Sequence, residues 1–315
     1  MPQAGGAGRG ASGCISVLMA TCNGARFLGE QLDSLAAQTD TNWQLWVSDD
    51  ASIDGTRDIV ARFGRRHPTR VLAGPQQGAA QNFLSMLLHP DLPSAPVAFA
   101  DQDDVWLAPK LARARQWLAR LPPDQPAVYA ATSVLVDAQL GPLGGQSRPP
   151  GIAPSFGNAL VQNLFSGHTM VLNAPAVALA RRAGPRPQIR YHDWWLYQLV
   201  AAAGGHLILD PTAVALYRQH DRNAIGASRG WRAATQRLDR LAGGDWAATM
   251  HAHACALRQA DGVLTPAARG TLDAFLNHFP ARGQARAAAF RQHGLTRSTR
   301  LSALILQIFA GLGRV

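Results

Sequence analysis

Cysteine is scarce in this chain. Its 315 residues include three cysteines, Cys14, Cys22 and Cys255, and their spacing forms neither a disulfide framework nor a zinc motif. On a helix, His251 and Cys255 would share one face but His253 would not, so these three side chains make a poor metal site. We therefore expect a protein of a reducing compartment.

Long apolar stretches are also missing. No run reaches the 18 or more residues of a membrane-spanning helix, and the nearest, 301–312, is about two-thirds of that length. Residues 1–13 are rich in Gly, Ala and Ser and lack the apolar segment of a signal peptide. We interpret them as a flexible leader, and we expect a cytoplasmic protein that is soluble or peripheral on the inner face of the plasma membrane.

Acidic residues are outnumbered by basic ones. Lys and Arg total 30 against 20 Asp and Glu, which gives a net charge of +10. Charged residues make up only 16% and hydrophobic residues 47%, a composition typical of a globular chain. A positive balance suits anionic partners such as nucleotide diphosphates, lipid headgroups or nucleic acid. Because much of the excess follows Gly226, we favour an anionic membrane surface for the tail over a nucleic acid, with a solvated basic face as the alternative.

Short apolar runs rich in β-branched residues alternate with helical patterns through the first half of the chain. Strands are predicted at 14–20, 43–48, 71–73, 97–100, 128–136, 169–172 and 207–209. This alternation indicates an α/β fold with a mainly parallel central sheet and flanking helices. We predict a main domain over 14–226 that includes a surface loop at 141–154, and a helical C-terminal extension over 227–315.

An acidic turn follows the strand at 97–100. The strand runs directly into Asp101-Gln102-Asp103-Asp104, at the carboxyl end where open α/β sheets bind ligands. Clustered carboxylates repel one another, and a divalent cation relieves the repulsion. Oxygen ligands favour a hard ion such as Mg²⁺ or Mn²⁺, shared with substrate phosphates. We predict a metal site at Asp101 and Asp103, while Asp104 is also explained as a cap for the next helix.

Two further strand ends carry polar residues. Asp49 and Asp50 follow the strand at 43–48, where a carboxylate can accept hydrogen bonds from a base N–H or from ribose hydroxyls. A role in tying down loops explains either aspartate equally well. After the first strand, the segment 21–24 offers backbone amides and a glycine for close approach to a nucleotide.

These motifs, in this order, resemble the family-2 inverting glycosyltransferases of GT-A fold, especially bacterial rhamnosyltransferase-like members. The resemblance covers about 14–226 and is carried by 15–24, 30–35 with Gln38, 48–56, Gly78 with Asn82 and Phe83, and 101–106. It implies a GT-A fold and a DxD pair, Asp101 and Asp103, that contacts ribose and metal. It also implies a nucleotide surrounded by Thr21, Asn23, Asp49, Asp50, Gly78 and Asn82.

The segment His192-Asp193-Trp194-Trp195 is similar to the one in which this family places its general base, usually an acid preceded by another acid. Here His192 precedes, so Asp193 is the predicted base and the role of His192 stays open. An inverting transfer needs such a base within reach of the acceptor hydroxyl. A helix N-cap would also explain Asp193, and Trp194 and Trp195 are expected either to stack on sugars or to belong to the core.

Residues 217–220, Tyr-Arg-Gln-His, resemble the closing motif of the family. The resemblance implies that His220 is a third metal ligand, and neutral imidazole is a legitimate ligand for Mn²⁺. Arg218 is expected to offset diphosphate charge. Asn163 and residues 167–169 match a segment that lines the donor and acceptor cleft.

The sequence thus predicts an inverting glycosyltransferase that depends on Mn²⁺ or Mg²⁺. It would move a sugar, rhamnose or another hexose, from a nucleoside-diphosphate sugar to a hydroxyl of a glycan or lipid-linked glycan in cell-surface polysaccharide or glycolipid synthesis. The alternatives are a nucleotidyltransferase and a non-catalytic sugar-nucleotide-binding module. Leu301, Ile305, Ile308 and Phe309 recur at helical spacing, so we expect the extension to dock on an anionic membrane surface or on a partner.

Overall fold

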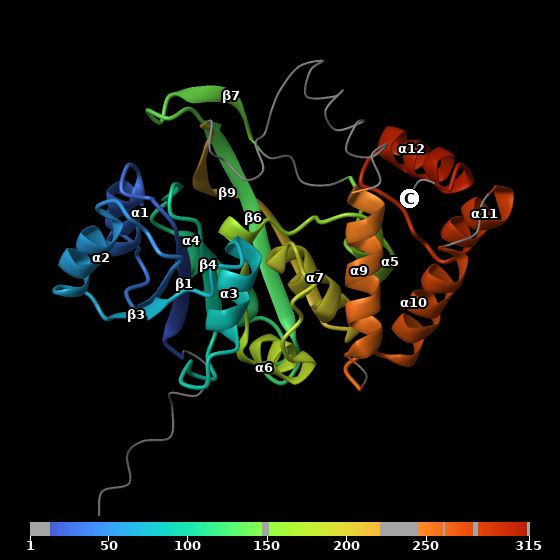
Figure 1. Ribbon diagram of the computed structural model, residues 1–315, viewed down its shortest axis with the longest axis horizontal. Helices are drawn as coiled ribbons and strands as arrows, with labels where there is room; N and C mark the ends of the chain where they lie inside the picture. The colour runs from blue at the N-terminus through green and yellow to red at the C-terminus, as the bar shows by residue number, and fades with distance from the viewer. Residues whose placement is uncertain (1–12, 147–150, 221–244, 261, 280–282, 314–315) are drawn as a thin grey trace, which may run out of the picture.

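The computed structural model describes residues 13–146, 151–220, 245–260, 262–279 and 283–313. Among them, nine strands form one sheet in the order β3-β2-β1-β4-β8-β6-β9-β5, with β7 paired to β6. Helices cover the sheet, and a group of further helices lies to one side of it (Figure 1). The predicted α/β fold is confirmed, whereas residues 1–12 of the predicted leader lie outside the described residues.

The first half of the sheet is parallel. Its strands are β1 (Ile15–Thr21), β2 (Trp43–Asp49), β3 (Thr69–Ala73) and β4 (Val97–Ala100). The helices between them are α1 (Leu28–Ala36), α2 (Thr56–Gly64) and α3 (Ala79–Leu87). β1 is buried along almost its whole length, which matches its continuous apolar sequence, because helices cover both faces of a parallel sheet.

Two apolar cores flank the sheet, because successive side chains of a strand point to opposite faces. On β1, Leu18 belongs to the larger core, whereas Val17 and Met19 belong to the smaller one. Helices α1, α2 and α4 (Lys110–Leu118) cover the smaller core. Helices α3, α6 (Ala174–Ala183) and α7 (His192–Ala202) cover the larger one.

The second half of the sheet is mixed. It comprises β5 (Val105–Trp106), β6 (Ala127–Val136), β7 (Pro142–Gln146), β8 (Val171–Leu172) and β9 (His206–Arg218). β6 and β9 are parallel, but β8 is antiparallel to β4 and β6, β5 to β9, and β7 to β6. The parallel prediction therefore holds for β1 to β4 and for β6 with β9. Short turns can join only antiparallel neighbours such as β6 and β7, since parallel neighbours need a crossover.

Two segments differ from their predicted structure. The stretch 141–154, predicted as a loop, includes β7, in which Pro142 takes the first strand position, where a missing N–H is tolerated. The predicted strand 207–209 is only the beginning of β9, whose pairing with β6 shifts register near Thr132. The extent of both strands depends on their pairing with β6, and local sequence propensity does not predict such pairing. Helix α5 (Phe156–Val161) and a single 3-10 turn, η1 (Gly167–Thr169), precede β8.

The C-terminal part is helical, as predicted. Its helices are α9 (Asp245–Gln259), α10 (Pro266–His278), α11 (Gln284–Gln292) and α12 (Arg300–Gly311). They share the larger core with α7, and the Trp246 ring stacks on Trp194 with 4.6 Å between centroids. The predicted domain boundary at Gly226 lies outside the described residues and stays a prediction. No helix in the described ranges is long and apolar enough to cross a membrane.

Candidate active site

The acidic turn lies between β4 and β5, and the sheet brings the end of β9 to it. β5 pairs with β9 through Val105 and Leu216, so the chain that follows β9 passes beside the turn. There Nε2 of His220 lies 2.8 Å from Oδ2 of Asp103. The His220 ring also stacks on Phe27, with 4.9 Å between centroids. Two residues that are distant in sequence thus form one pair of candidate metal ligands.

Arg218 supports this turn from inside. Its backbone N–H donates to Oδ1 of Asp104 at 3.1 Å, and its Nε donates to the carbonyl of Asp103 at 2.8 Å. The remaining guanidinium nitrogens bind the Ala138 carbonyl and the Glu30 carboxylate. Because the side chain is 1% exposed and all three nitrogens have protein partners, the structure does not place Arg218 where it could meet a diphosphate without rearrangement.

The carboxylates of the turn are electrostatically strained. Burial raises the pKa of Asp101 to about 7, and the charges of Asp103 and Asp193 add to this effect. Burial also raises the pKa of Asp104 well above its usual value, with further contributions from Asp101 and Asp103. Asp193 accepts a hydrogen bond from the Gly167 N–H, and the next residue, His168, lies against Asp101, so the start of α7 is close to the acidic turn. A cation bound here would relieve the repulsion.

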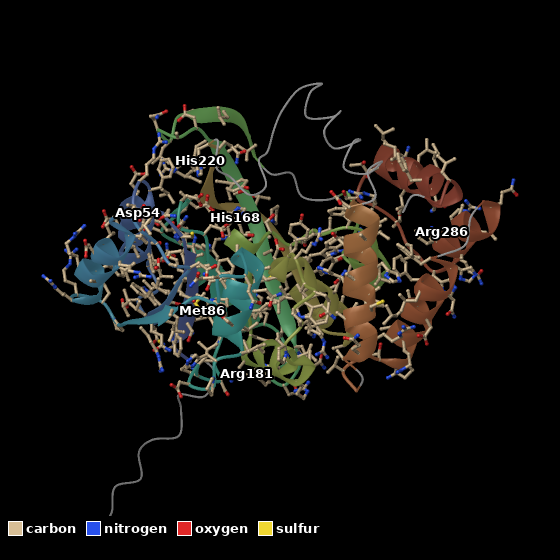
Figure 2. The ribbon with its side chains drawn as sticks, in the orientation of Figure 1. Asp54, Met86, His168, Arg181, His220 and Arg286 are labelled. Atoms are coloured by element: carbon tan, nitrogen blue, oxygen red, sulfur yellow. The ribbon has the colours of Figure 1, made fainter. Side chains whose placement is uncertain are left out.

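Two buried side chains, His168 and Lys110, lie behind the acidic turn. Ligand atoms of Asp101, Asp104 and His168 lie within 4.8 Å of one another. Oδ2 of Asp104 and Nε2 of His168 are buried without a hydrogen-bond partner among the described residues. Beneath them Lys110, the only lysine in the sequence, donates to the His168 carbonyl and lies 3.3 Å above the Trp106 ring. In Figure 2, His168 and His220 lie toward the same end of the sheet, and Arg181 lies toward the other end.

The loops that follow β1 and β2 are joined to each other by hydrogen bonds beside the acidic turn. The Asp49 carboxylate is 4% exposed and accepts bonds from Thr21 Oγ1 at 2.9 Å, Ser52 Oγ at 2.6 Å and Arg57 Nε at 2.7 Å. Burial acts to raise the pKa of Asp49, but these hydrogen bonds outweigh it and hold the pKa below its usual value. Asp49 therefore ties the loops together. Asp50, which is only half-buried, accepts a bond from the Gln76 N–H at 2.9 Å.

Gln102 clamps the first loop to the acidic turn. Its side chain accepts from the Cys22 N–H at 3.0 Å and donates to the Cys22 carbonyl at 3.1 Å. A Cβ atom on Gly24 would lie 2.1 Å from Oε1 of Gln102, so a larger residue here would displace the Gln102 side chain. Asn23 takes a left-handed conformation with φ 48°, and its side chain accepts from the Ile53 N–H at 3.0 Å.

The predicted residues at α3 lie on the same edge of the sheet. Asn82 is buried and donates from Nδ2 to the Ser48 carbonyl at 3.0 Å, which ties α3 to the end of β2. Gly78, at the N-cap of α3, has φ 84°, a conformation that favours glycine. The strand ends that carry Thr21, Asp49 and Asp101 thus meet at one edge, as the sequence predicted.

Asp193 lies in the first turn of α7, whose N-cap is Tyr191. The predicted alternative of an N-cap role for Asp193 is therefore wrong. Its Oδ2 accepts from the Gly167 N–H at 3.0 Å and its Oδ1 from the Trp194 N–H at 2.7 Å, so the carboxylate is held in one orientation. A Cβ atom on Gly167 would lie 2.9 Å from Nε2 of His192, which explains the glycine.

The aromatic neighbours of Asp193 belong to the core. Trp194 and Trp195 are 0% and 1% exposed, so neither presents a face for a sugar ring. His192 packs against Phe83 and Phe99, with 4.2 and 5.2 Å between ring centroids. Burial lowers the pKa of His192, which keeps its ring neutral.

Comparison with known proteins identifies this arrangement. Residues 16–146, which run from β1 to β7 through the acidic turn, match the model of glycosyl transferase family 2. The chain carries a family-2 glycosyltransferase domain. The prediction of a nucleotide-sugar-dependent glycosyltransferase is thereby confirmed over that of a nucleotidyltransferase.

Two curated relatives are similar in sequence to this glycosyltransferase. A dTDP-rhamnosyl transferase, RfbG of Shigella flexneri, is 26% identical over 238 residues, which cover 70% of this chain and 78% of the relative. A UDP-Glc:alpha-D-GlcNAc-diphosphoundecaprenol beta-1,3-glucosyltransferase, WfgD of Escherichia coli, is 32% identical over 97 residues, which cover 31% of this chain and 38% of the relative.

Solved structures share the fold of the glycosyltransferase. TarS of Staphylococcus aureus in complex with UDP-GlcNAc superposes with a TM-score of 0.61 at 16% identity, covering 95% of this chain and 88% of TarS. A mannosyltransferase from Pyrobaculum calidifontis, in complex with GDP-Man and Mn²⁺, gives 0.55 at 22% identity over 96% and 81% of the two chains. The predicted GT-A fold is confirmed.

The sequence missed two members of the cluster in the glycosyltransferase. Lys110 was not predicted as a site residue, although a single lysine shortly after an acidic turn is a usable signal. His168 was predicted only as part of a segment lining the cleft, whereas the structure places its ring against Asp101 and Asp104. Nothing local marks His168, because η1 and β8 carry it to the turn through pairing with β4 and β6.

Proposed function

We propose that this glycosyltransferase moves a hexose or deoxyhexose from a nucleoside diphosphate to an acceptor hydroxyl with inversion at the sugar carbon. The observation that carries the proposal is that His220 reaches Asp103 in the acidic turn, while Asp193 is bonded to Gly167 beside His168, which lies against Asp101. An inverting transfer needs a base on the side of the acceptor and charge stabilisation on the side of the leaving diphosphate. The cluster offers residues for both tasks.

Asp101, Asp103 and His220 are the proposed metal ligands. Carboxylate oxygens suit Mg²⁺ and Mn²⁺, and the imidazole nitrogen favours Mn²⁺ of the two. When bound, the ion would stabilise the departing diphosphate as a Lewis acid. Asp104 and His168 form the inner, buried part of the cluster, which the buried Lys110 closes from behind by donating to the His168 carbonyl. We therefore assign the cation to the outer ligands rather than to the inner pair.

Asp193 is the proposed general base. The Gly167 and Trp194 amides each hold one carboxylate oxygen, and each oxygen keeps a lone pair that can accept the proton of the acceptor hydroxyl. His192 lies neutral and buried beneath it, so we propose that His192 supports the start of α7 and transfers no proton. The new sugar bond would form on the side of Asp193, opposite the diphosphate.

The nucleotide is proposed to lie over the ends of β1 and β2 and the start of α3. Asp50, Asn23 and Gly78 line this edge and are the proposed contacts to base and ribose. Thr21, Asp49 and Asn82 are buried and bonded to the loops, so we propose that they shape the site from beneath. We also propose that Arg218 positions Asp103 instead of contacting the diphosphate.

The two curated relatives support a specific donor and acceptor class. The name of the Shigella protein supports a dTDP-linked sugar, with rhamnose first, as the donor. The name of the Escherichia protein supports a glycan linked to a lipid diphosphate as the acceptor. We therefore propose a role in cell-surface polysaccharide or glycolipid synthesis, at the inner face of the plasma membrane.

The test combines a binding and a transfer measurement on the full chain. Thermal shifts with UDP-, dTDP- and GDP-sugars, with and without Mn²⁺, identify the donor, because bound ligand raises the unfolding temperature. Asp193→Asn should keep the donor-induced shift and reduce transfer by about 10²- to 10⁴-fold. Equal transfer by the variant and the wild type would refute the base. A donor shift that does not depend on Mn²⁺ or Mg²⁺ would refute the metal assignment.

A further inference from the structure

Helix α12 presents an apolar face to solvent. Four of the seven exposed large hydrophobic residues in the described ranges lie on or just after this helix, with side chains 51–68% exposed: Leu301, Leu304, Ile308 and Leu312. Their spacing of three or four residues puts them on one side of the helix, and we call this set the α12 face. Of the predicted docking residues, Leu301 and Ile308 belong to it, whereas Ile305 and Phe309 are half-buried.

The rest of the helix is fixed to the protein. Leu306 and Ala310, on the opposite side, are 3% and 0% exposed and belong to the larger core. The start of α12 is set by a capping box in which Thr299 and Ser302 exchange side-chain and backbone bonds. The helix is therefore already formed and anchored, and its apolar outer face needs no folding step to be used. In Figure 1, α12 lies at the top of the helical part, on the side of the molecule away from β1 to β3.

The surroundings of the α12 face are basic. The described residues of 266–313 contain five arginines and one acidic residue, Asp273. Two exposed arginines lie next to the face, Arg300 in the first turn of α12 and Arg291 on α11, whose Nη1 donates to Oε1 of Gln307 at 3.3 Å. An apolar strip bordered by arginines is the composition of a helix that lies in the headgroup region of an anionic bilayer.

We propose that α12 docks on an anionic lipid surface, with the α12 face among the acyl chains and Arg291 and Arg300 against the headgroups. A lipid surface fits better than a second copy of the chain, because a stable dimer buries about 800 Å² on each partner, more than one face of a three-turn helix offers. The helix is too short to cross the bilayer, so it would lie in the plane of the interface. The inference stands whichever sugar the active site transfers.

Flotation of the full chain with vesicles tests the proposal. Vesicles of phosphatidylcholine alone are compared with vesicles that also contain phosphatidylglycerol. We expect binding to the anionic vesicles that weakens with added salt. The double variant Leu304→Ser/Ile308→Ser should bind at least about tenfold more weakly, because burial of these side chains drives insertion. Arg291→Gln and Arg300→Gln should each weaken binding about fivefold.

Val71→Ser is the matched control, because Val71 is a 54% exposed aliphatic residue on β3, outside the α12 face. It should bind vesicles like the wild type. All variants should keep the wild-type unfolding temperature and the wild-type transfer to a soluble acceptor, since none touches the core or the active site. Undiminished vesicle binding by the double serine variant would overturn the proposal. The proposal would also be overturned if neither protein bound vesicles and the wild type were a dimer that the double serine variant converts to a monomer. The α12 face would then join two chains.

Discussion

Asp101→Asn should make the metal-free protein more stable at neutral pH, although it removes a proposed metal ligand. In the folded protein the pKa of Asp101 is raised from 3.8 to about 7 by burial and by Asp103 and Asp193. Between about pH 4 and 7 the folded state therefore keeps a proton that the unfolded chain has released. Folding stability falls as pH rises through this window, because the folded state binds more protons than the unfolded one.

The size of the effect follows from the shift. The rise in the pKa of Asp101 from 3.8 to about 7 lowers the free energy of unfolding by roughly 4 kcal/mol at pH 7 and above, since a pKa change of one corresponds to about 1.4 kcal/mol. The amide of Asp101→Asn carries no charge that must be buried. The free energy of unfolding of the variant should therefore exceed that of the wild type by up to roughly this amount at pH 7.5 and by almost nothing near pH 4. Asparagine is also close to aspartate in size, so the packing of the turn should persist.

Urea unfolding with EDTA, measured from pH 4 to 8, gives the free energy of unfolding of each protein. The difference between Asp101→Asn and wild type should grow with pH, and saturating Mn²⁺ should stabilise only the wild type strongly. Asp124→Asn removes an exposed carboxylate and should show no such difference. A variant that is as stable as the wild type, or less stable, at pH 7.5 without metal would refute the electrostatic account of the turn.

Two further substitutions test the outer ligands and the loop clamp. His220→Ala should weaken Mn²⁺ binding at least about tenfold in donor-dependent thermal shifts, because it removes the nitrogen that faces Asp103, whereas His251→Ala on the exposed side of α9 should not. Gly24→Ala should cost about 1–2 kcal/mol in urea unfolding and raise the KM for the donor, because its methyl group displaces the Gln102 clamp and its two hydrogen bonds. An unchanged KM would show that the clamp does not shape the donor site.

The local sequence pattern was enough to predict the first half of the sheet and the position of the aspartates at its strand ends. The apolar runs of β1, β2 and β4 each end in polar residues, and parallel strands bring their carboxyl ends to one edge, so Thr21, Asp49 and Asp101 were predicted to meet. The periodicity of α1 and the helical C-terminal part were predicted in the same way. These features depend on residues close together in the chain.

Tertiary structure decided how the site is completed. His220 reaches Asp103 only because β9 pairs with β5, and His168 reaches Asp104 only because β8 is inserted between β4 and β6. The burial of Lys110 beneath the cluster depends on the same packing. Such contacts join residues far apart in the chain, and no local period records which distant strand will be the neighbour.

The outer face of α12 shows the same division. The sequence by itself determined that 301–312 is apolar at helical spacing and follows a segment with several scattered arginines. Only the packing of Leu306 and Ala310 into the core decided which side of that helix turns outward, and so placed Leu304 and Leu312 in solvent instead of Ile305 and Phe309. A helix whose apolar residues extend over more than one face has no preferred orientation until a neighbour covers one of those faces.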